Sequence, residues 1–304
     1  MNRRTPGLRP GLVAGLVLAC ALALAGALGL AACSSPESKL EAAAALRHEG
    51  KPREAIAAYQ ALLGALGQEP LPAGQAAVRV KALRAAGDLS YLELGDYAGA
   101  IAYYRRIISL APGTPEALGA RSVIGDIFRD RFKDRLAAIA QWADIAASEA
   151  PQAAAFQLKI AREYLELGNR EQARTEARIL RERWPTSREA DEAQLLTAQA
   201  WALEKKHEEA LGAFQALVER GAAPEITARA LEGQAHIHAQ NGLFDRALEL
   251  YALALPNHPN PEAIRTNIEA VRRRKEAART ATPGDRDQAF DYGKTQPTTR
   301  EVTP

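Results

Sequence analysis

The chain has little net charge and few aromatic residues. Its formal charge is +2, and phenylalanine, tryptophan and tyrosine together make up 6% of 304 residues. Arg3, Arg4 and Arg9 are the only charged residues among the first 32, so the formal charge of residues 33–304 is −1. Proteins that bind nucleic acid usually carry a strong basic excess on one face. We therefore expect no nucleic-acid partner.

Motifs that carry chemistry are missing as well. The sequence has no G-x-x-x-x-G-K-[ST] loop, G-x-G-x-x-G fingerprint, H-E-x-x-H pair or G-x-S-x-G elbow. His236 and His238 lie two residues apart, and on a helix such side chains point about 200° apart, so they cannot chelate one ion. We expect no enzymatic activity, no cofactor, no metal site and no small-molecule substrate.

The N-terminus resembles a secretory signal. The arginines precede an uncharged apolar run from Gly11 to Ala32, which is the order of a signal peptide. The sequence Leu30-Ala31-Ala32-Cys33 resembles the lipobox of bacterial lipoproteins, and polarity begins at once with Ser34. We expect residues 1–32 to be a cleaved lipoprotein signal peptide and Cys33 to be acylated. The alternative is an uncleaved membrane anchor, because the run is long enough to span a bilayer.

Cleavage would leave a single cysteine. Cys20 would be removed with the signal, so neither an internal disulfide nor a cysteine-ligated zinc site could form. Ser34 stands where an aspartate retains lipoproteins in the inner membrane of well-studied envelopes. The resemblance therefore implies an outer-membrane lipoprotein that faces the periplasm. Residues 33–37 would be its tether.

The remaining chain predicts helices that recur in pairs. Alanine and leucine dominate, and most polar positions hold good helix formers. One aromatic position recurs at separations of 37, 36, 37 and 37 residues, as Tyr91, Phe128, Tyr164, Trp201 and, more weakly, His238. A small position recurs with it, as Ala100, Ala138, Ala173, Ala210 and Ala247. Two positions with one period indicate a helical repeat array.

The segment Gly87–Tyr104, with Gly95 at a turn and Pro112 after the second helix, resembles a tetratricopeptide repeat. The resemblance implies an all-α solenoid of about six helical hairpins over residues 38–280, in which the first-helix aromatic fills the space between paired helices. Pro261–Thr280 carries Ile264, Ile268 and Val271 on one stripe, which predicts a closing amphipathic helix. Residues 281–304 are polar and are expected to be disordered. The turn of the third pair is unusual, because Arg129–Arg135 replaces the glycine.

In this family the first helices line a concave surface that binds other proteins. Counting from the turn glycines, the candidate groove residues are Leu89, Leu92, Glu93, Arg162, Leu165, Glu166, Gln199, Glu232, His236 and Gln240. Their mixture of apolar, charged and amide groups suits an extended protein or peptide client. Arg272–Lys275 is the densest charge run. It is either a solvated helix end, where cations are favourable, or a surface for an anionic partner or for lipid headgroups.

Lipidated cysteine, short tether and helical repeats together resemble two kinds of outer-membrane lipoprotein. One is the accessory lipoprotein of the β-barrel assembly machine, and the other is the pilotin of a type IV pilus secretin. The leading hypothesis is a lipid-anchored scaffold for envelope assembly. A pilotin, an accessory subunit of a cell-wall enzyme and a catalyst without recognisable motifs are the alternatives.

Overall fold

The computed structural model describes residues 35–67 and 70–280, and these contain 13 α-helices and no strand. The all-α prediction is confirmed. In chain order the helices are α2 (Pro36–His48), α3 (Pro52–Ala65), α4 (Ala73–Leu92), α5 (Tyr97–Leu110), α6 (Pro115–Ile127), α7 (Arg135–Ala147), α8 (Ala153–Glu166), α9 (Arg170–Arg183), α10 (Arg188–Leu203), α11 (His207–Glu219), α12 (Pro224–Gln240), α13 (Phe244–Ala254) and α14 (Pro261–Thr280). They correspond to the six predicted pairs and the closing helix. The signal peptide, Cys33 and residues 281–304 lie outside the described residues.

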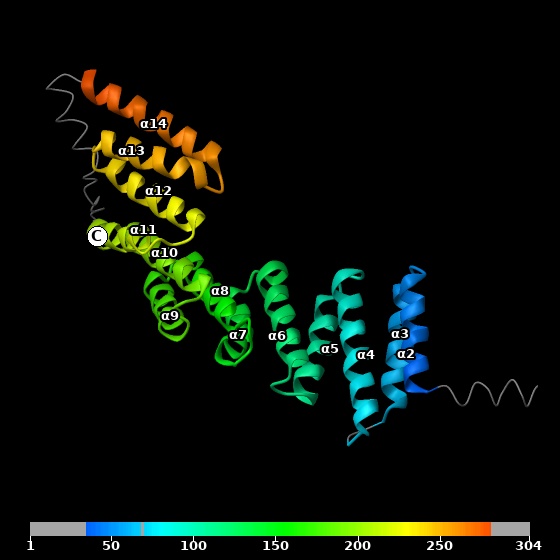
Figure 1. Cartoon of the computed structure of the whole chain (residues 1–304). Helices are drawn as coiled ribbons and strands as arrows, with labels where there is room; N and C mark the ends of the chain where they lie inside the picture. Colours follow the sequence, from blue (N-terminus) through cyan, green and yellow to red (C-terminus); the bar gives the residue numbers. More distant parts are fainter. Residues whose placement is uncertain (1–34, 68–69, 281–304) are drawn as a thin grey trace, which may run out of the picture. The chain divides into compact units, whose positions relative to one another are not determined.

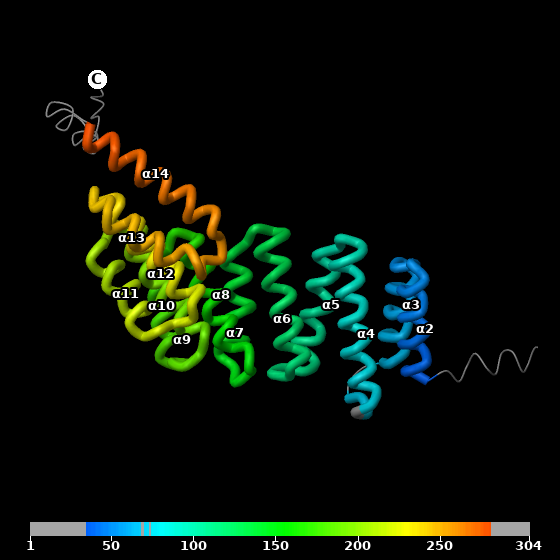
Figure 2. The backbone as a smooth tube through the Cα atoms, turned by 45° about the horizontal axis from the view of Figure 1, so that its top comes forward, coloured from blue at the N-terminus to red at the C-terminus, as the bar shows by residue number. Residues whose placement is uncertain are grey.

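The chain divides into two compact units, and the boundary falls inside α7. Unit 1 ends at Gln141, and unit 2 begins at Trp142. Consecutive helices from α2 to α6 in unit 1, and from α8 to α14 in unit 2, run in opposite directions and pack side by side (Figures 1 and 2). Such pairs bury their apolar faces only against their neighbours, which is the physical basis of repeat folds.

Side-chain caps fix where many helices begin. Ser35, Thr114 and Ser187 each accept a hydrogen bond from the backbone N–H three residues on, at the starts of α2, α6 and α10. Asp96 and Asn169 do the same for α5 and α9. Each such cap contributes about 1 kcal/mol. The starts of the helices are thus encoded locally.

Residues in the left-handed backbone region form the turns between the two helices of a pair. Gly95, Gly168 and Gly242 have φ of 65°, 78° and 78°, and Lys133 and Lys205 take the same region with φ of 57° and 60°. Before Lys133, residues Phe128–Phe132 form a π-helix. The unusual sequence of the third turn therefore makes a different connection between α6 and α7.

The small repeat position packs as expected. Ala55, Ala100, Ala138, Ala173, Ala210 and Ala247 on the second helices have no exposed surface. The predicted role of the first-helix aromatics is not confirmed, because all five are only half-buried. The ring that is fully buried lies four residues after the alanine, as Tyr59, Tyr104, Trp142, Phe214 and Tyr251, each at most 2% exposed. One helical turn separates the two positions, so methyl group and ring lie on the same buried stripe.

Candidate interaction surface

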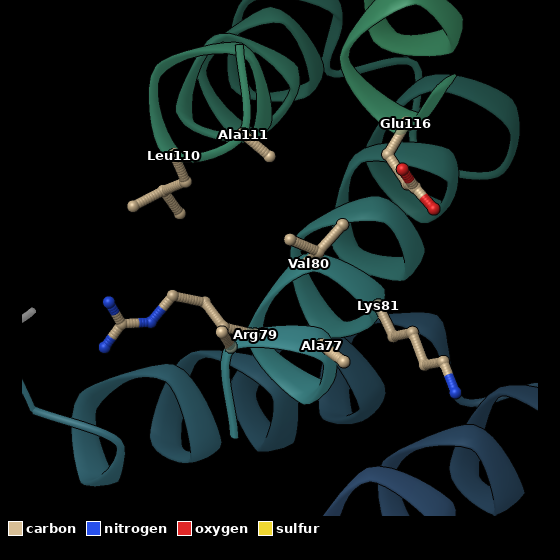
Figure 3. Close-up of a pocket in the computed structure, with 8 residues that line it drawn as sticks. Ala77, Arg79, Val80, Lys81, Leu110, Ala111 and Glu116 are labelled. Carbon is tan, nitrogen blue, oxygen red and sulfur yellow. The ribbon is translucent and has the colours of Figure 1, made fainter. Parts of the chain in front are cut away.

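Two adjoining hollows follow α4 in unit 1. The first, about 300 Å³, is lined by Ala76, Ala77, Arg79, Val80, Lys81, Leu110, Ala111 and Glu116. The second, about 260 Å³, is lined by Arg47, Val80, Lys81, Arg84, Ala85, Asp88, Ile107 and Glu116. They share Val80, Lys81 and Glu116, and together form what we call the α4 groove. Figure 3 shows Val80 between Arg79 and Lys81, with Leu110 at the end of α5, the next residue Ala111, and Glu116 of α6 around the same space.

Contacts within unit 1 fix several groups that line the groove. The Arg47 guanidinium donates to Glu93 at 2.8 Å, and the Arg84 guanidinium donates to Asp88 at 3.0 Å. The Tyr104 hydroxyl also donates to Asp88, at 2.6 Å. Burial, and next that hydrogen bond, raise the pKa of Tyr104 well above its ordinary value, so it stays a neutral donor.

Two charged groups of the groove remain available. Within the part of the chain that the structure describes, Lys81 and Glu116 make no hydrogen bond or ion pair. A floor of apolar side chains with one free cation and one free anion can bury an apolar side chain of a peptide and orient its backbone. The α4 groove therefore has the composition of a peptide site.

The residues of α4 that the sequence analysis selected are not the ones that line the hollows. Leu89 has no exposed surface, so its assignment to the groove was wrong. It shares a buried stripe with Ala82 and Ala86, seven and three residues before it. Leu92 is 66% exposed and Glu93 pairs with Arg47, but neither lines a hollow.

The residues that do line the groove were missed. Ala77, Val80, Lys81, Arg84 and Asp88 recur at three- and four-residue spacing on the opposite stripe of α4. That second stripe is visible in the sequence. The sequence analysis located its candidates by their distance from the turn glycine Gly95. That distance gives a position along α4, but it does not tell which face of the helix is buried.

In unit 2 the first helices are tied together by ion pairs. Arg162 of α8 and Arg229 of α12 each donate to Glu192 of α10 at 3.0 Å. Glu192, which the sequence analysis did not select, thus bridges three first helices. The predicted residues Leu165 and Gln199 are half-buried, and Glu166 and Gln240 are exposed. Their role in binding stays a prediction.

Two histidines of unit 2 make polar contacts within the unit. His236 Nδ1 lies 3.1 Å from the Tyr251 hydroxyl, and His258 Nε2 lies 3.0 Å from a carboxylate oxygen of Glu232. Burial, and next the Arg246 charge, lower the pKa of His238, so it is neutral at pH 7. In the described ranges no group of three His, Cys, Asp or Glu side chains could hold a metal ion.

Some of the basic side chains of Arg272–Lys275 on α14 make contacts within the chain. Lys275 donates to Asp245, and the Arg274 guanidinium lies 5.4 Å from the centre of the Phe244 ring. Arg273 lies 4.0 Å from Glu269. These contacts favour the interpretation of Arg272–Lys275 as part of a solvated helix face over the hypothesis of an anion-binding surface. None of the described helices combines the length and apolar character needed to cross a bilayer.

Comparison with known sequences agrees with this geometry. The tetratricopeptide repeat family matches residues 40–115, 86–154, 158–225 and 213–260. The chain belongs to the tetratricopeptide repeat family. TPR repeats typically form scaffolds for protein or peptide partners, and their presence suggests an interaction scaffold here. No curated protein sequence matches it.

Solved structures share the TPR fold at low sequence identity. The apo form of RapI is 13% identical with a TM-score of 0.53, over 80% of this chain and 72% of that one. A chain of the Naa15/Naa10 complex bound to HypK-THB is 16% identical with a TM-score of 0.52, over 78% of this chain and 34% of that one. PilW, a type IV pilus biogenesis factor, is 17% identical with a TM-score of 0.45, over 77% of this chain and 98% of that one. At these identities the likeness is one of fold.

Proposed function

We propose that this TPR protein is a lipid-anchored scaffold that faces the periplasm and holds a protein client at the outer membrane through the α4 groove. The observation that carries the client site is the groove itself, with its apolar floor and the unpaired charges of Lys81 and Glu116. The anchor rests on the lipobox before Cys33, which lies outside the described residues.

The start of α2 supports a short tether. Ser35 caps α2, and the helix begins at Pro36, two residues earlier than the sequence predicted. Two residues lie between Cys33 and Pro36, so the chain from one to the other spans at most about 11 Å when extended. Unit 1 would therefore lie against the bilayer to which Cys33 is attached.

The first hollow lies at the end of unit 1 where α2 begins, which is the end nearest the proposed anchor. Pro36, Ala76 and Glu116 lie in the first turns of α2, α4 and α6, and Leu110 ends α5. Because consecutive helices alternate in direction, these four residues share one end of the unit. Figure 1 shows the N-terminal ends of α2 and α4 at the same edge. A client bound there would lie close to the membrane, which suits a segment of an outer-membrane protein or of its assembly machine.

The anchor is tested by feeding cells a labelled fatty acid. We expect the label on the wild-type protein and not on Cys33→Ala. We also expect the wild-type protein in the outer-membrane fraction. Label on both forms, or fractionation of the wild type with the inner membrane, would contradict the proposed anchoring.

The client site is tested by photocrosslinking. A photoreactive residue at Ala77, which lines the groove, is compared with one at Ala57, an exposed position on α3. We expect a crosslinked protein from position 77 alone, lost in Lys81→Glu and kept in Lys39→Glu, which reverses an exposed lysine on α2. Equal crosslinking at both positions would rule out the groove.

The identity of the crosslinked protein separates the remaining alternatives. A barrel-assembly subunit favours the leading hypothesis, a secretin favours a pilotin, and a peptidoglycan enzyme favours an accessory subunit. The genes beside this one would point the same way.

A further inference from the structure

A separate hollow lies on the second helices of unit 2. It measures about 470 Å³ and is lined by Arg178, Arg181, Glu182, Pro185, Ala190 and Arg220. The arginines come from the last turns of α9 and from the residue that ends α11, and Ala190 belongs to the first turn of α10. We call it the arginine hollow.

Two of its three arginines are neutralised by the chain itself. Arg178 donates to Glu182 at 2.9 Å, and Arg220 donates to Asp191 of α10. Arg181 makes no hydrogen bond or ion pair with any residue that the structure describes. The hollow thus contains three guanidinium groups and only two carboxylate partners.

The surroundings of Arg181 disfavour its positive charge. The side chain is half-buried. Burial, and next the nearby Arg220 charge, lower the pKa of Arg181, while Glu182 acts in the opposite direction. Arg181 lies near the C-terminal end of α9, where the helix dipole favours a cation. A solvent-exposed arginine would gain the same benefit, so the dipole does not explain why Arg181 is half-buried beside Arg220.

We propose that the arginine hollow binds a carboxylate of an acidic segment of a protein partner, with Arg181 as the group that receives it. A guanidinium binds a carboxylate through two parallel N–H donors. Glu182 and Asp191 show that the arginines of this hollow already bind carboxylates. The incoming Asp or Glu supplies the third partner. The site is separate from the α4 groove and does not depend on the lipid anchor.

The charges favour a peptide over a membrane surface. Recognition of anionic lipid by charge takes clusters of about four to eight basic residues. Here one arginine is unpaired, and the carboxylates of Glu182 and Asp191 would repel an anionic bilayer. A single acidic side chain needs only one unpaired guanidinium.

The test uses the full chain in detergent and a fluorescent octapeptide with four glutamates, both ends blocked. We expect anisotropy to show binding that is absent for the same peptide with glutamines. Arg181→Gln should weaken it by about tenfold or more, as expected for loss of a charged hydrogen bond. Arg178→Gln, at a more exposed position, should weaken it less. Arg273→Gln, at an exposed arginine of α14, should not change it. No binding, or an equal loss in Arg273→Gln, overturns the proposal.

Two further variants separate binding from folding. Arg181→Glu places the missing carboxylate within the chain, so we expect it to abolish peptide binding and to raise the melting temperature. Arg181→Gln that lowers the melting temperature with unchanged peptide affinity would show a structural role and overturn the proposal. Lys81→Glu, in the α4 groove, should leave binding of the acidic peptide intact. A failure of the proposed client site in the α4 groove can therefore be told apart from a failure of the arginine hollow.

The same variants are also tested for binding to lipid vesicles. Sedimentation with phosphatidylglycerol vesicles should not depend on Arg181. Vesicle binding that Arg181→Gln removes, without peptide binding, would assign the hollow to a lipid headgroup and refute the acidic-peptide assignment.

Discussion

The guanidinium carbon of Arg174 lies 3.6 Å from the centre of the Trp201 ring. The same guanidinium donates to Glu204 at 2.6 Å, and the Lys206 ammonium lies 4.5 Å from the ring on which Arg174 stacks. These contacts surround Lys205, the turn residue with positive φ. They connect α9 to the end of α10 where the repeat pattern expects a glycine.

Arg174→Ala should destabilise unit 2. The pair with Glu204 is mostly buried, with side chains 14% and 21% exposed, and the substitution also removes the cation–π contact. We expect a loss of about 1–3 kcal/mol in the free energy of unfolding, measured by urea denaturation. The control Arg178→Ala removes an exposed i,i+4 pair on the same helix and should cost about 0.5 kcal/mol or less. Equal losses would show that the contacts of Arg174 with Glu204 and Trp201 together contribute no more than an exposed ion pair.

The pair with Glu204 should make stability depend on pH. The hydrogen bond from Arg174 holds the pKa of Glu204 below its ordinary 4.5, outweighing partial burial, which acts in the opposite direction. A carboxylate with a lowered folded-state pKa stabilises above the unfolded pKa, and this contribution is lost as the pH falls through the folded value. Glu204→Gln should therefore be less stable than wild type at pH 7, and the difference should be smaller at an acidic pH below 4.5. A difference that is the same at both pH values would exclude the ionic origin.

Lys205→Gly should stabilise the turn between α10 and α11. A residue with a Cβ atom loses about 1 kcal/mol in the left-handed region, where glycine is unstrained. We expect a gain of up to about 1 kcal/mol, seen as a higher urea midpoint. The reciprocal change Gly168→Ala, at φ 78°, should be destabilising. A stability loss in Lys205→Gly would mean that the lysine side chain contributes more than the strain costs.

Gly233→Ala should overpack the contact between α12 and α11. A Cβ atom at Gly233 would overlap the ring of Phe214, which is 2% exposed. We expect a loss of about 1–3 kcal/mol in unfolding free energy. Gly212, also helical, has open space around its missing Cβ, so Gly212→Ala should be neutral or stabilising by about 1 kcal/mol. Equal effects at both positions would contradict this packing.

The repeat positions were predictable because each depends on local spacing. The alanines from Ala100 to Ala247 recur with one period, and a side chain larger than a methyl group would overpack every one of those sites. The buried rings four residues later, such as Tyr104 and Phe214, follow the same period and could have been found in the sequence. The first-helix aromatics share the period, but they are only half-buried, because recurrence does not report how deeply a side chain packs.

The groove and the arginine hollow were not predictable in this way. Lys81 and Glu116 lie on different helices, and Arg181 on α9 is far in sequence from Arg220, which caps the end of α11. Whether such charges are paired depends on which carboxylates neighbouring helices bring within about 4 Å. Glu93 and Arg47 are 46 residues apart and pair, while Lys81 does not.

The sequence by itself determined that helices form, where many of them begin and that they recur in pairs, since caps, turn residues and apolar spacing act over a few residues. Tertiary structure decided which face of α4 is buried, which arginines find carboxylates and where hollows remain. Those features depend on distances between helices, and no single segment of the chain encodes them.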